Sequence, residues 1–215
     1  MVRPPGHHGG VSKGGHWQSV YSTRPSTEVS WFQGDPAVST RLVAQAGALS
    51  ELRVVDVGAG TSTLVDALLG RGCRDVTVLD LSVAALSEVR ARLGIRAAAV
   101  AFEAVDVLGW TPAGSYDVWH DRAVFHFLVD PRDQARYVQV ATAAVRPGGH
   151  MVIGAFADDG PTHCSGLPTC RFTADELAQQ FAPAFTVVTR AREEHVTPGG
   201  VMQPFTWLLL QRADA

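Results

Sequence analysis

Residues 54–62 read Val-Val-Asp-Val-Gly-Ala-Gly-Thr-Ser, an apolar run that ends in an acid and two glycines. The run predicts a buried strand over residues 52–57, and the glycines predict a tight turn into a helix over residues 61–69. Because Gly58 and Gly60 lack a Cβ atom, a ligand can approach the backbone of this turn closely. The segment therefore indicates a strand, a ligand-binding turn and a helix at the start of an α/β sheet.

The alternation of short apolar runs with helical patterns continues along the chain. It predicts further helices over residues 82–93, 134–145 and 173–181, and further strands over residues 76–79, 97–102, 116–120, 151–156, 185–190 and 205–211. Strands that alternate with helices form a parallel sheet covered on both faces. The last two strands have no helix between them, so they can pair only antiparallel, through a loop of about 14 residues. We expect an α/β fold with a doubly wound, Rossmann-like sheet of seven strands, mostly parallel, whose last strand is antiparallel.

The composition is that of an ordinary globular protein. The 215 residues are 46% hydrophobic and 18% charged with a net charge of −3, and no apolar run reaches the length of about 18 residues that a membrane span needs. The basic residues are dispersed among acids, so we expect no nucleic-acid partner and no membrane partner. Three cysteines make an odd count in a chain of this length, which favours a reducing, cytoplasmic location over a disulfide scaffold.

The chain is expected to comprise a tail and one domain. Residues 1–15 are rich in Gly and His and lack the apolar stretch of a secretion signal, so they are predicted to be a disordered tail. Residues 16–215 are predicted to form a single domain. Within it, residues 16–50 form an aromatic, helical cover, and residues 51–215 form the Rossmann-like core. The oligomeric state is left open between monomer and homodimer.

Two further acids lie at or just after the ends of the second and third predicted strands. Asp80 ends the second predicted strand, twenty residues after Gly60, where a carboxylate can accept hydrogen bonds from both hydroxyls of a ribose. Asp106 follows the third predicted strand, within reach of an adenine edge. A nicotinamide dinucleotide fits less well, because that site needs a small residue where Thr63 stands and because Asp56 suits a cation rather than a diphosphate. S-Adenosylmethionine has an ammonium, a sulfonium and no phosphate.

The chain resembles the class I S-adenosylmethionine-dependent methyltransferases over about residues 31–212. The likeness rests on the order of Asp-Val-Gly-Ala-Gly-Thr-Ser, Asp80, Asp106, Tyr-Asp-Val-Trp-His-Asp and Arg-Pro-Gly-Gly, followed by a closing antiparallel strand. One departure is Ser62, which stands where many members have a third glycine. The resemblance implies an enzyme that uses S-adenosylmethionine and releases S-adenosylhomocysteine. It implies that the cofactor is bound by Trp31, Asp56, Gly58, Ala59, Gly60, Ser62, Asp80, Leu81, Asp106, Val107 and Asp121.

The methyl acceptor is expected against the loops beyond the carboxyl ends of the strands, where ligands of open α/β sheets lie. Methyl transfer from a sulfonium is an in-line displacement, so the protein mainly aligns the nucleophile with the methyl group and excludes water. A base is needed only for an acceptor that arrives protonated. The candidate bases are His126 and His195, which are neutral imidazoles at pH 7, and then Asp121. A packed core position for His126 and a surface position for His195 are the alternatives. The candidate acceptor contacts are Phe32, Arg122, Cys164, Arg171 and Gln203.

Three classes of function stay open. A small-molecule methyltransferase acting on N, O or S leads, because several aromatic and His-containing loops could enclose a compact acceptor. The segments at residues 30–32 and 119–122 also resemble a subgroup that includes protein lysine methyltransferases, whose members typically carry Asp-Lys-Gly where this chain has Asp121-Arg122-Ala123. The third class is a module that binds S-adenosylmethionine without turnover. No metal is expected, because the spacing of His163, Cys164 and Cys170 fits no usual zinc site.

Overall fold

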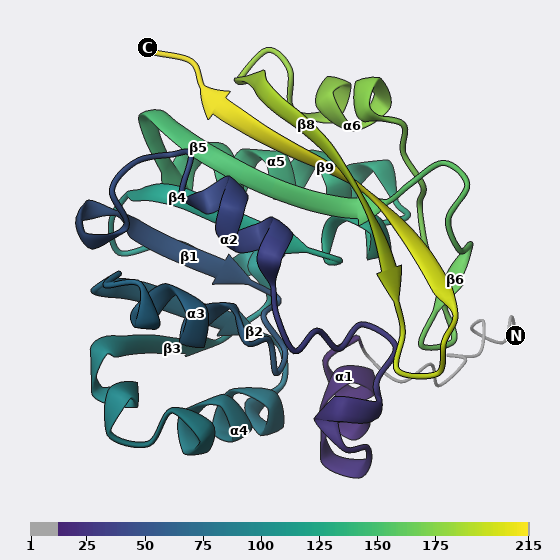
Figure 1. The fold of residues 1–215 in the computed structure, drawn as a ribbon. Coiled ribbons are helices and arrows are strands. Elements are labelled where there is room, and N and C mark those ends of the chain that lie inside the picture. Colours follow the sequence, from purple (N-terminus) through teal and green to yellow (C-terminus); the bar gives the residue numbers. More distant parts are fainter. Residues whose placement is uncertain (1–12, 215) are drawn as a thin grey trace, which may run out of the picture.

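The computed structural model describes residues 13–214, and one seven-stranded sheet forms its centre (Figure 1). The sheet order is β3-β2-β1-β4-β5-β9-β8. Neighbouring strands from β3 to β5 are parallel, whereas β9 runs antiparallel to both β5 and β8. The predicted doubly wound, mostly parallel sheet with an antiparallel last strand is confirmed. The strands are β1 (Arg53–Val57), β2 (Asp75–Asp80), β3 (Val100–Ala104), β4 (Tyr116–Arg122), β5 (Val145–Phe156), β8 (Phe185–Val196) and β9 (Met202–Arg212).

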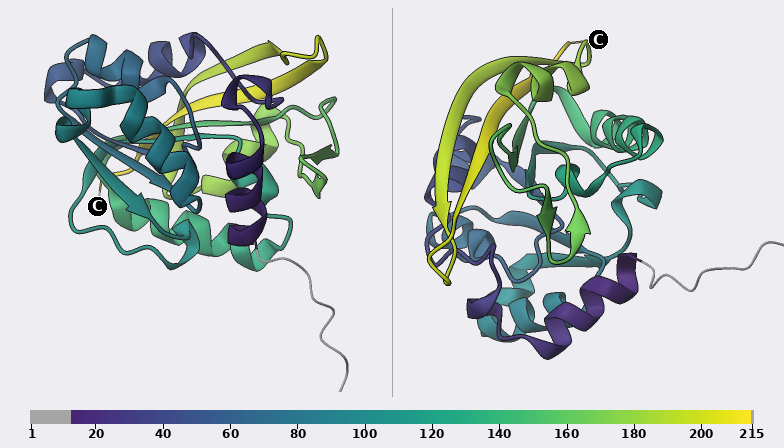
Figure 2. Two further views of the ribbon diagram at one scale, coloured as in Figure 1. Left: turned by 90° about the horizontal axis from the view of Figure 1, so that it is seen from below. Right: turned by 90° about the vertical axis from the view of Figure 1, so that its right-hand side faces the viewer.

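Helices cover both faces of the sheet and make three layers (Figure 2). Alternate residues of a strand point to opposite faces, so Val54 packs against one helical layer and Val55 against the other. The first layer holds α2 (Ala37–Val43), α3 (Leu64–Gly70) and α4 (Val83–Leu93), and the second holds α5 (Pro131–Ala144) and α6 (Ala174–Phe181). Among residues 13–214, no helix is both long and apolar enough to cross a membrane.

Shorter elements surround this core. The helix α1 (Lys13–Thr23) packs beside α4, and a small hairpin is made of β6 (His163–Cys164) and β7 (Leu167–Pro168) (Figure 1). The first twelve residues of the predicted disordered tail lie outside the described part of the chain. Its last three residues, 13–15, instead begin α1. The 3-10 helices are η1 (Ser26–Glu28), η2 (Leu49–Glu51), η3 (Gly94–Ala99), η4 (Val107–Gly109) and η5 (Phe125–Phe127).

Two boundaries differ from the prediction near the first three strands. The helix α3 begins at Leu64 rather than at residue 61, because the Ser62 hydroxyl accepts the backbone N–H of Leu64 and residues 61–63 remain in the turn. The strand β3 begins at Val100 rather than at residue 97, because η3 occupies the preceding residues. Both differences lengthen a connection between a strand and a helix, the first after β1 and the second before β3.

The last two strands are longer than predicted, and this changes the location of several candidate residues. β8 runs to Val196 and β9 begins at Met202, so residues 197–201 connect them instead of 14 residues. Charged and polar side chains alternate along β8, an edge strand, and they hide the apolar pattern that marks a strand in sequence. His195 and Gln203 are therefore register partners in the sheet rather than loop residues.

Candidate active site

A cavity of about 940 Å³, counted with its opening to solvent, lies at the carboxyl ends of β1, β2, β4 and β5. This is the edge where open α/β sheets bind their ligands. A smaller cavity of about 480 Å³ shares Tyr21, Trp31, Gly58 and Arg122 with the larger one. Among the predicted site residues, the larger cavity is lined by Trp31, Gly58, Asp80, Leu81, Asp106, Val107, Arg122, Cys164 and Gln203. The smaller cavity is lined by Trp31, Phe32, Asp56, Gly58, Ala59, Ser62 and Arg122.

The glycine turn forms part of the floor of these cavities, and its two glycines are required by space. Gly58 and Gly60 have φ angles of +58° and +53°, in the left-handed region. A Cβ atom on Gly60 would lie 2.1 Å from the hydroxyl oxygen of Tyr21, and one on Gly58 would lie 2.0 Å from a methyl carbon of Val124. A side chain at either position would collide with its neighbour.

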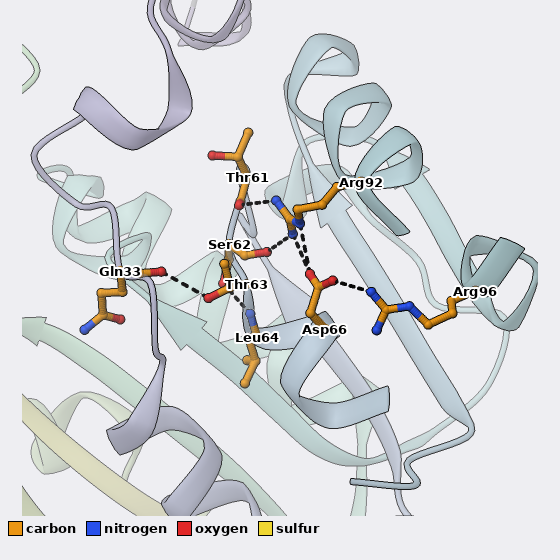
Figure 3. A network of polar contacts seen from close by, with 8 residues as sticks. All are labelled: Gln33, Thr61, Ser62, Thr63, Leu64, Asp66, Arg92 and Arg96. Carbon is orange, nitrogen blue, oxygen red and sulfur yellow. Dashed lines mark hydrogen bonds and ion pairs between the residues drawn. The ribbon is translucent and has the colours of Figure 1, made fainter. Parts of the chain in front are cut away.

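The side chain of Arg92 on α4 binds the backbone of residues 61 and 62, which follow the glycine turn (Figure 3). The Arg92 guanidinium donates hydrogen bonds to the carbonyl oxygens of Thr61 at 2.8 Å and Ser62 at 2.6 Å. Asp66 pairs with both Arg92 and Arg96, which positions the guanidinium of Arg92. These contacts order the turn from α4, on the layer that holds α3, before any ligand is present.

Asp80 joins the end of β2 to the glycine turn. Its carboxylate accepts the backbone N–H groups of Gly60 and Ser82, each at 2.7 Å. Burial raises the pKa of Asp80 to about 6. Each oxygen carries one backbone hydrogen bond and keeps a second lone pair for a ligand. The more exposed Asp106 caps η4 by accepting the N–H of Leu108, and the adjacent Val107 is buried.

Asp56 and His120 are register partners on β1 and β4, on the face that α2 covers. Nδ1 of His120 lies 2.7 Å from Oδ1 of Asp56, and Nε2 lies 2.9 Å from the hydroxyl of Ser39. All three residues are only 2% exposed. Oδ2 of Asp56 is buried and has no hydrogen-bond partner among the described residues. Because a buried, unpaired carboxylate oxygen is costly, this atom suits a cationic group in the smaller cavity.

The opposite walls of the larger cavity are aromatic and come from elements far apart in sequence. Trp17 of α1 contacts Trp31 and Phe127 edge-on, with ring centroids 5.6 and 5.1 Å away. Phe156 of β5 and Phe205 of β9 pack together at 5.0 Å. The aromatic walls are an apolar, water-excluding surround for a ligand.

Residues 54–149 match the family model described as a methyltransferase domain. A structure reported for the conversion of a disulfide bond into a thioacetal group during echinomycin biosynthesis is 25% identical to this chain, with a TM-score of 0.73 over 92% of this chain and 91% of that one. The Burkholderia thailandensis 1,6-didemethyltoxoflavin-N1-methyltransferase, solved with 1,6-didemethyltoxoflavin and S-adenosylhomocysteine, is 24% identical, with a TM-score of 0.68 over 91% and 81% of the two chains. The N-methyltransferase NodS from Bradyrhizobium japonicum, solved with S-adenosylhomocysteine, is 16% identical, with a TM-score of 0.69 over 92% and 98%. No curated protein matches the chain at a significant level.

Residues 54–149 form a methyltransferase domain, and the sheet order and the structural neighbours are those of class I S-adenosylmethionine-dependent methyltransferases. The matched domain spans β1 to the start of β5, so it includes the glycine turn, Asp80 and Asp106. The α1 helix, the β6–β7 hairpin and the β8–β9 pair lie outside it.

The predicted cofactor and base roles of Asp121 do not agree with its position in this methyltransferase. Asp121 is fully buried on the face of β4 that α5 covers, and it lines neither cavity. Its carboxylate accepts the N–H groups of Val124 and Phe125 and the hydroxyl of Tyr137. Burial raises the pKa of Asp121 to about 6. The acid stabilises the loop after β4, because three donors already occupy its oxygens.

The two candidate histidine bases also lie outside the lining of both cavities. His126 is completely buried and stacks on Phe156, and its Nδ1 accepts the N–H of Phe156. Burial, aided by the charge of Arg122, lowers the pKa of His126 to about 3, so the ring stays neutral. His195 uses Nε2 to bind the carbonyl oxygen of Ser30 at 2.7 Å. The core alternative holds for His126, whereas His195 is a buried strand residue, which corrects both the base role and the surface alternative.

The predicted acceptor contacts fall into two groups. Arg122, Cys164 and Gln203 line the larger cavity, and Phe32 lines the smaller one. Arg171 lines neither cavity and reaches the carbonyl oxygen of Gly160 at 3.5 Å, so it lies apart from the other predicted acceptor contacts. Several lining residues were not among the named site candidates, namely Trp17, Tyr21, Phe127, Phe156, Phe205 and His120. A signal for two of them was available, because Trp17 and Tyr21 are four residues apart and share one face of a helix.

Proposed function

We propose that this methyltransferase moves a methyl group from S-adenosylmethionine to a small molecule enclosed beneath α1. The observation that carries this proposal is the attachment of α1 on both sides of the cavity. His16 contacts the hydroxyl of Ser165 in the β6–β7 turn at 3.2 Å. Gln18 accepts hydrogen bonds from the Ser82 hydroxyl at 3.1 Å and from the Ala84 N–H at 3.2 Å. A helix fixed at both sides forms a roof rather than the open channel that a protein side chain would need.

The residues around the cavities fit S-adenosylmethionine along its length. Asp80 would hold the ribose hydroxyls, and Leu81, Asp106 and Val107 would surround the adenine. The smaller cavity would take the methionine end, with Oδ2 of Asp56 paired to the ammonium. The fit rests on the orphaned oxygen of Asp56 and on the missing Cβ atoms of the glycine turn. When bound, the cofactor supplies a methyl group on a positively charged sulfur.

The chain itself contributes alignment and the exclusion of water. Positive charge is lost in this displacement, so an apolar surround costs the transition state less than the ground state. Trp17, Tyr21 and Phe127 supply that surround. The only imidazole that lines a cavity in the described part of the chain belongs to His120, and both of its nitrogens are occupied. The site therefore favours an acceptor that already carries a lone pair at neutral pH, such as an amine or a ring nitrogen.

A protein lysine acceptor is the second candidate, and one observation disfavours it. The guanidinium of Arg122 lines the larger cavity, and no carboxylate lies within ion-pair distance of it among the described residues. A second cation, the lysine side chain, would be repelled by Arg122. A module that binds S-adenosylmethionine without turnover is the third candidate and shares the same cofactor contacts.

The test is methyl transfer from tritiated S-adenosylmethionine to a bacterial lysate that is then separated by molecular size. Wild type is compared with Asp80→Ala, which removes the ribose contact, and with Asp75→Ala, an exposed acid at the start of the same strand. We expect label in the small-molecule fraction with wild type and Asp75→Ala, and a large loss with Asp80→Ala. Label in protein bands would favour the lysine alternative. Tight binding of S-adenosylhomocysteine without any methyl transfer would favour a module that binds the cofactor without turnover.

A further inference from the structure

The guanidinium of Arg122 is buried with one complete hydrogen-bonding edge unused. Nη1 donates to the carbonyl oxygen of Trp31 at 2.9 Å. Nε and Nη2 are buried and have no hydrogen-bond partner among residues 13–214. These two nitrogens form the side-on fork of the guanidinium, whose parallel N–H groups match the two oxygens of a carboxylate. Burial lowers the pKa of Arg122 to about 10, so the group is still a cation at neutral pH.

The negative charge of Glu193 acts to raise the pKa of Arg122, against the effect of burial. The two side chains nevertheless do not form an ion pair. The two carboxylate oxygens of Glu193 accept hydrogen bonds from the side chains of Gln33 and Trp207. A buried cation without a paired anion is costly, and the cost is removed when an anionic ligand binds. The fork of Arg122 can therefore serve as an anion receptor within the cavity wall.

Gln203 provides a second unused polar atom close to that fork. Its Oε1 is buried without a hydrogen-bond partner in the described part of the chain, and the residue lines the same cavity. The guanidinium carbon of Arg122 lies 4.7 Å from the ring centroid of Phe205. Gln203 and Phe205 are two residues apart on β9, so their side chains leave the same face about 7 Å from each other. The two polar groups are thus within the span of one small aromatic molecule.

We propose that Arg122 and Gln203 together select the methyl acceptor, which is a small aromatic acid. The fork of Arg122 binds the carboxylate, and Oε1 of Gln203 accepts a hydrogen bond from an amino or hydroxyl group of the same molecule. Phe127, Phe156 and Phe205 pack around its ring. This inference rests on the proposed function, because it names the class of the small-molecule acceptor.

The cofactor also carries a carboxylate, and most neighbours of Arg122 favour the acceptor as its source. Arg122 and Trp31 line both cavities, including the smaller one to which the methionine end of the cofactor is assigned. Phe205, over which the guanidinium lies, Cys164, on which its charge acts, and Gln203 line the larger cavity and not the smaller one.

The first arm of the test separates the two sources of the carboxylate. Calorimetry measures the affinities of S-adenosylhomocysteine and of 5′-methylthioadenosine, which lacks the amino acid end, for wild type, Arg122→Gln and the control Arg171→Gln. We expect Arg122→Gln to bind both ligands as wild type does. If Arg122→Gln loses affinity for S-adenosylhomocysteine alone, the fork binds the cofactor and the inference is overturned.

The second arm uses protein saturated with S-adenosylhomocysteine and the probes benzoate, anthranilate and salicylate, each beside its amide. We expect anthranilate or salicylate to bind wild type at least about tenfold more tightly than its amide, a difference of about 1.4 kcal/mol. Arg122→Gln should abolish this preference. Gln203→Leu should weaken the probes that carry a donor and leave benzoate unchanged. Equal binding of acids and amides by wild type, or a preference that survives in Arg122→Gln, refutes the inference.

The two proposals fail in different ways. Transfer of label to small molecules without any preference for acids would leave the proposed function standing and overturn only the acceptor class. A clear preference for acids together with label in protein bands would overturn the proposed function and the acceptor assignment. Only the binding of anions by Arg122 would then stand.

Discussion

The side chains of His120 and Asp121 leave β4 on opposite faces of the sheet. Nδ1 of His120 lies 2.7 Å from Oδ1 of Asp56, whereas Asp121 accepts a hydrogen bond from the hydroxyl of Tyr137 on α5. Strand side chains alternate, so the side chain of Asp121 points away from the face of β4 on which His120 contacts Asp56. The acid that faces the smaller cavity is consequently Asp56, and Asp121 belongs to the core.

Asp56→Asn should weaken the binding of S-adenosylhomocysteine by about 1.5 to 3 kcal/mol, because the ligand's ammonium loses a charged acceptor. The affinity for 5′-methylthioadenosine should not change, because that molecule has no ammonium. Isothermal titration calorimetry measures both, with Asp75→Asn as the exposed control. An equal loss for both ligands would place Asp56 away from the methionine end.

Asp121→Asn should lower stability and leave cofactor affinity unchanged. The amide cannot accept from all three donors, the N–H groups of Val124 and Phe125 and the hydroxyl of Tyr137, so the cost is about 1 to 3 kcal/mol. Urea unfolding measures the first effect and calorimetry with S-adenosylhomocysteine the second. Tyr137→Phe is the matched variant, because it removes one donor and keeps the acid. A fall in cofactor affinity without a loss of stability would restore the cofactor role for Asp121.

The affinity for S-adenosylhomocysteine should fall as the pH is lowered from 7 to 5. Burial raises the pKa of Asp80 to about 6, and the ionised carboxylate is the better acceptor for ribose hydroxyls. Ligand binding therefore favours the ionised form, which is fully present above this pKa and lost as the pH falls through it. Asp80→Asn should bind more weakly and show a flatter pH profile. A profile of the same steepness in Asp80→Asn would assign the titration to another group.

Ala123→Gly should stabilise the protein by about 1 kcal/mol. Ala123 has a φ angle of +73°, in the left-handed region that costs a residue with a Cβ atom about that amount. Ala91→Gly on the exposed surface of α4 is the control, and it should destabilise by about 0.5 to 1 kcal/mol. Thermal unfolding measures the stability of both variants. A loss of stability in Ala123→Gly would show that the backbone of Ala123 is not strained.

The parallel core and the adenosyl half of the site could be predicted from local signals. The glycine turn, the apolar strand before it and the acid at the end of β2 are close in sequence, and each has a physical requirement that few residue types meet. Gly58, Gly60, Asp80 and Asp106 all lie where that pattern indicated, at one edge of the sheet. The parallel direction of most strands followed from the alternation of strands and helices.

The base candidates failed for reasons that reside in three dimensions. His126 is titratable and lies beside the expected acceptor loops in sequence, but its ring fills a gap between Phe156 and the loop after β4. His195 was expected in a loop and instead lies in β8, because the β8–β9 pairing extends beyond the apolar residues that mark it. Burial and hydrogen-bond partners, which decide whether an imidazole can act as a base, are not local properties.

The sequence by itself determined the sheet, the glycine turn and the position of Asp80 and Asp106 at the carboxyl ends of β2 and β3. Only the tertiary structure decided that α1 roofs the cavity, that Asp56 rather than Asp121 faces the smaller cavity, and that Arg122 meets Gln203 and Phe205. The first set depends on propensities and spacings within a few turns of chain. The second set depends on contacts between segments up to about 150 residues apart, whose geometry is set by packing of the whole domain.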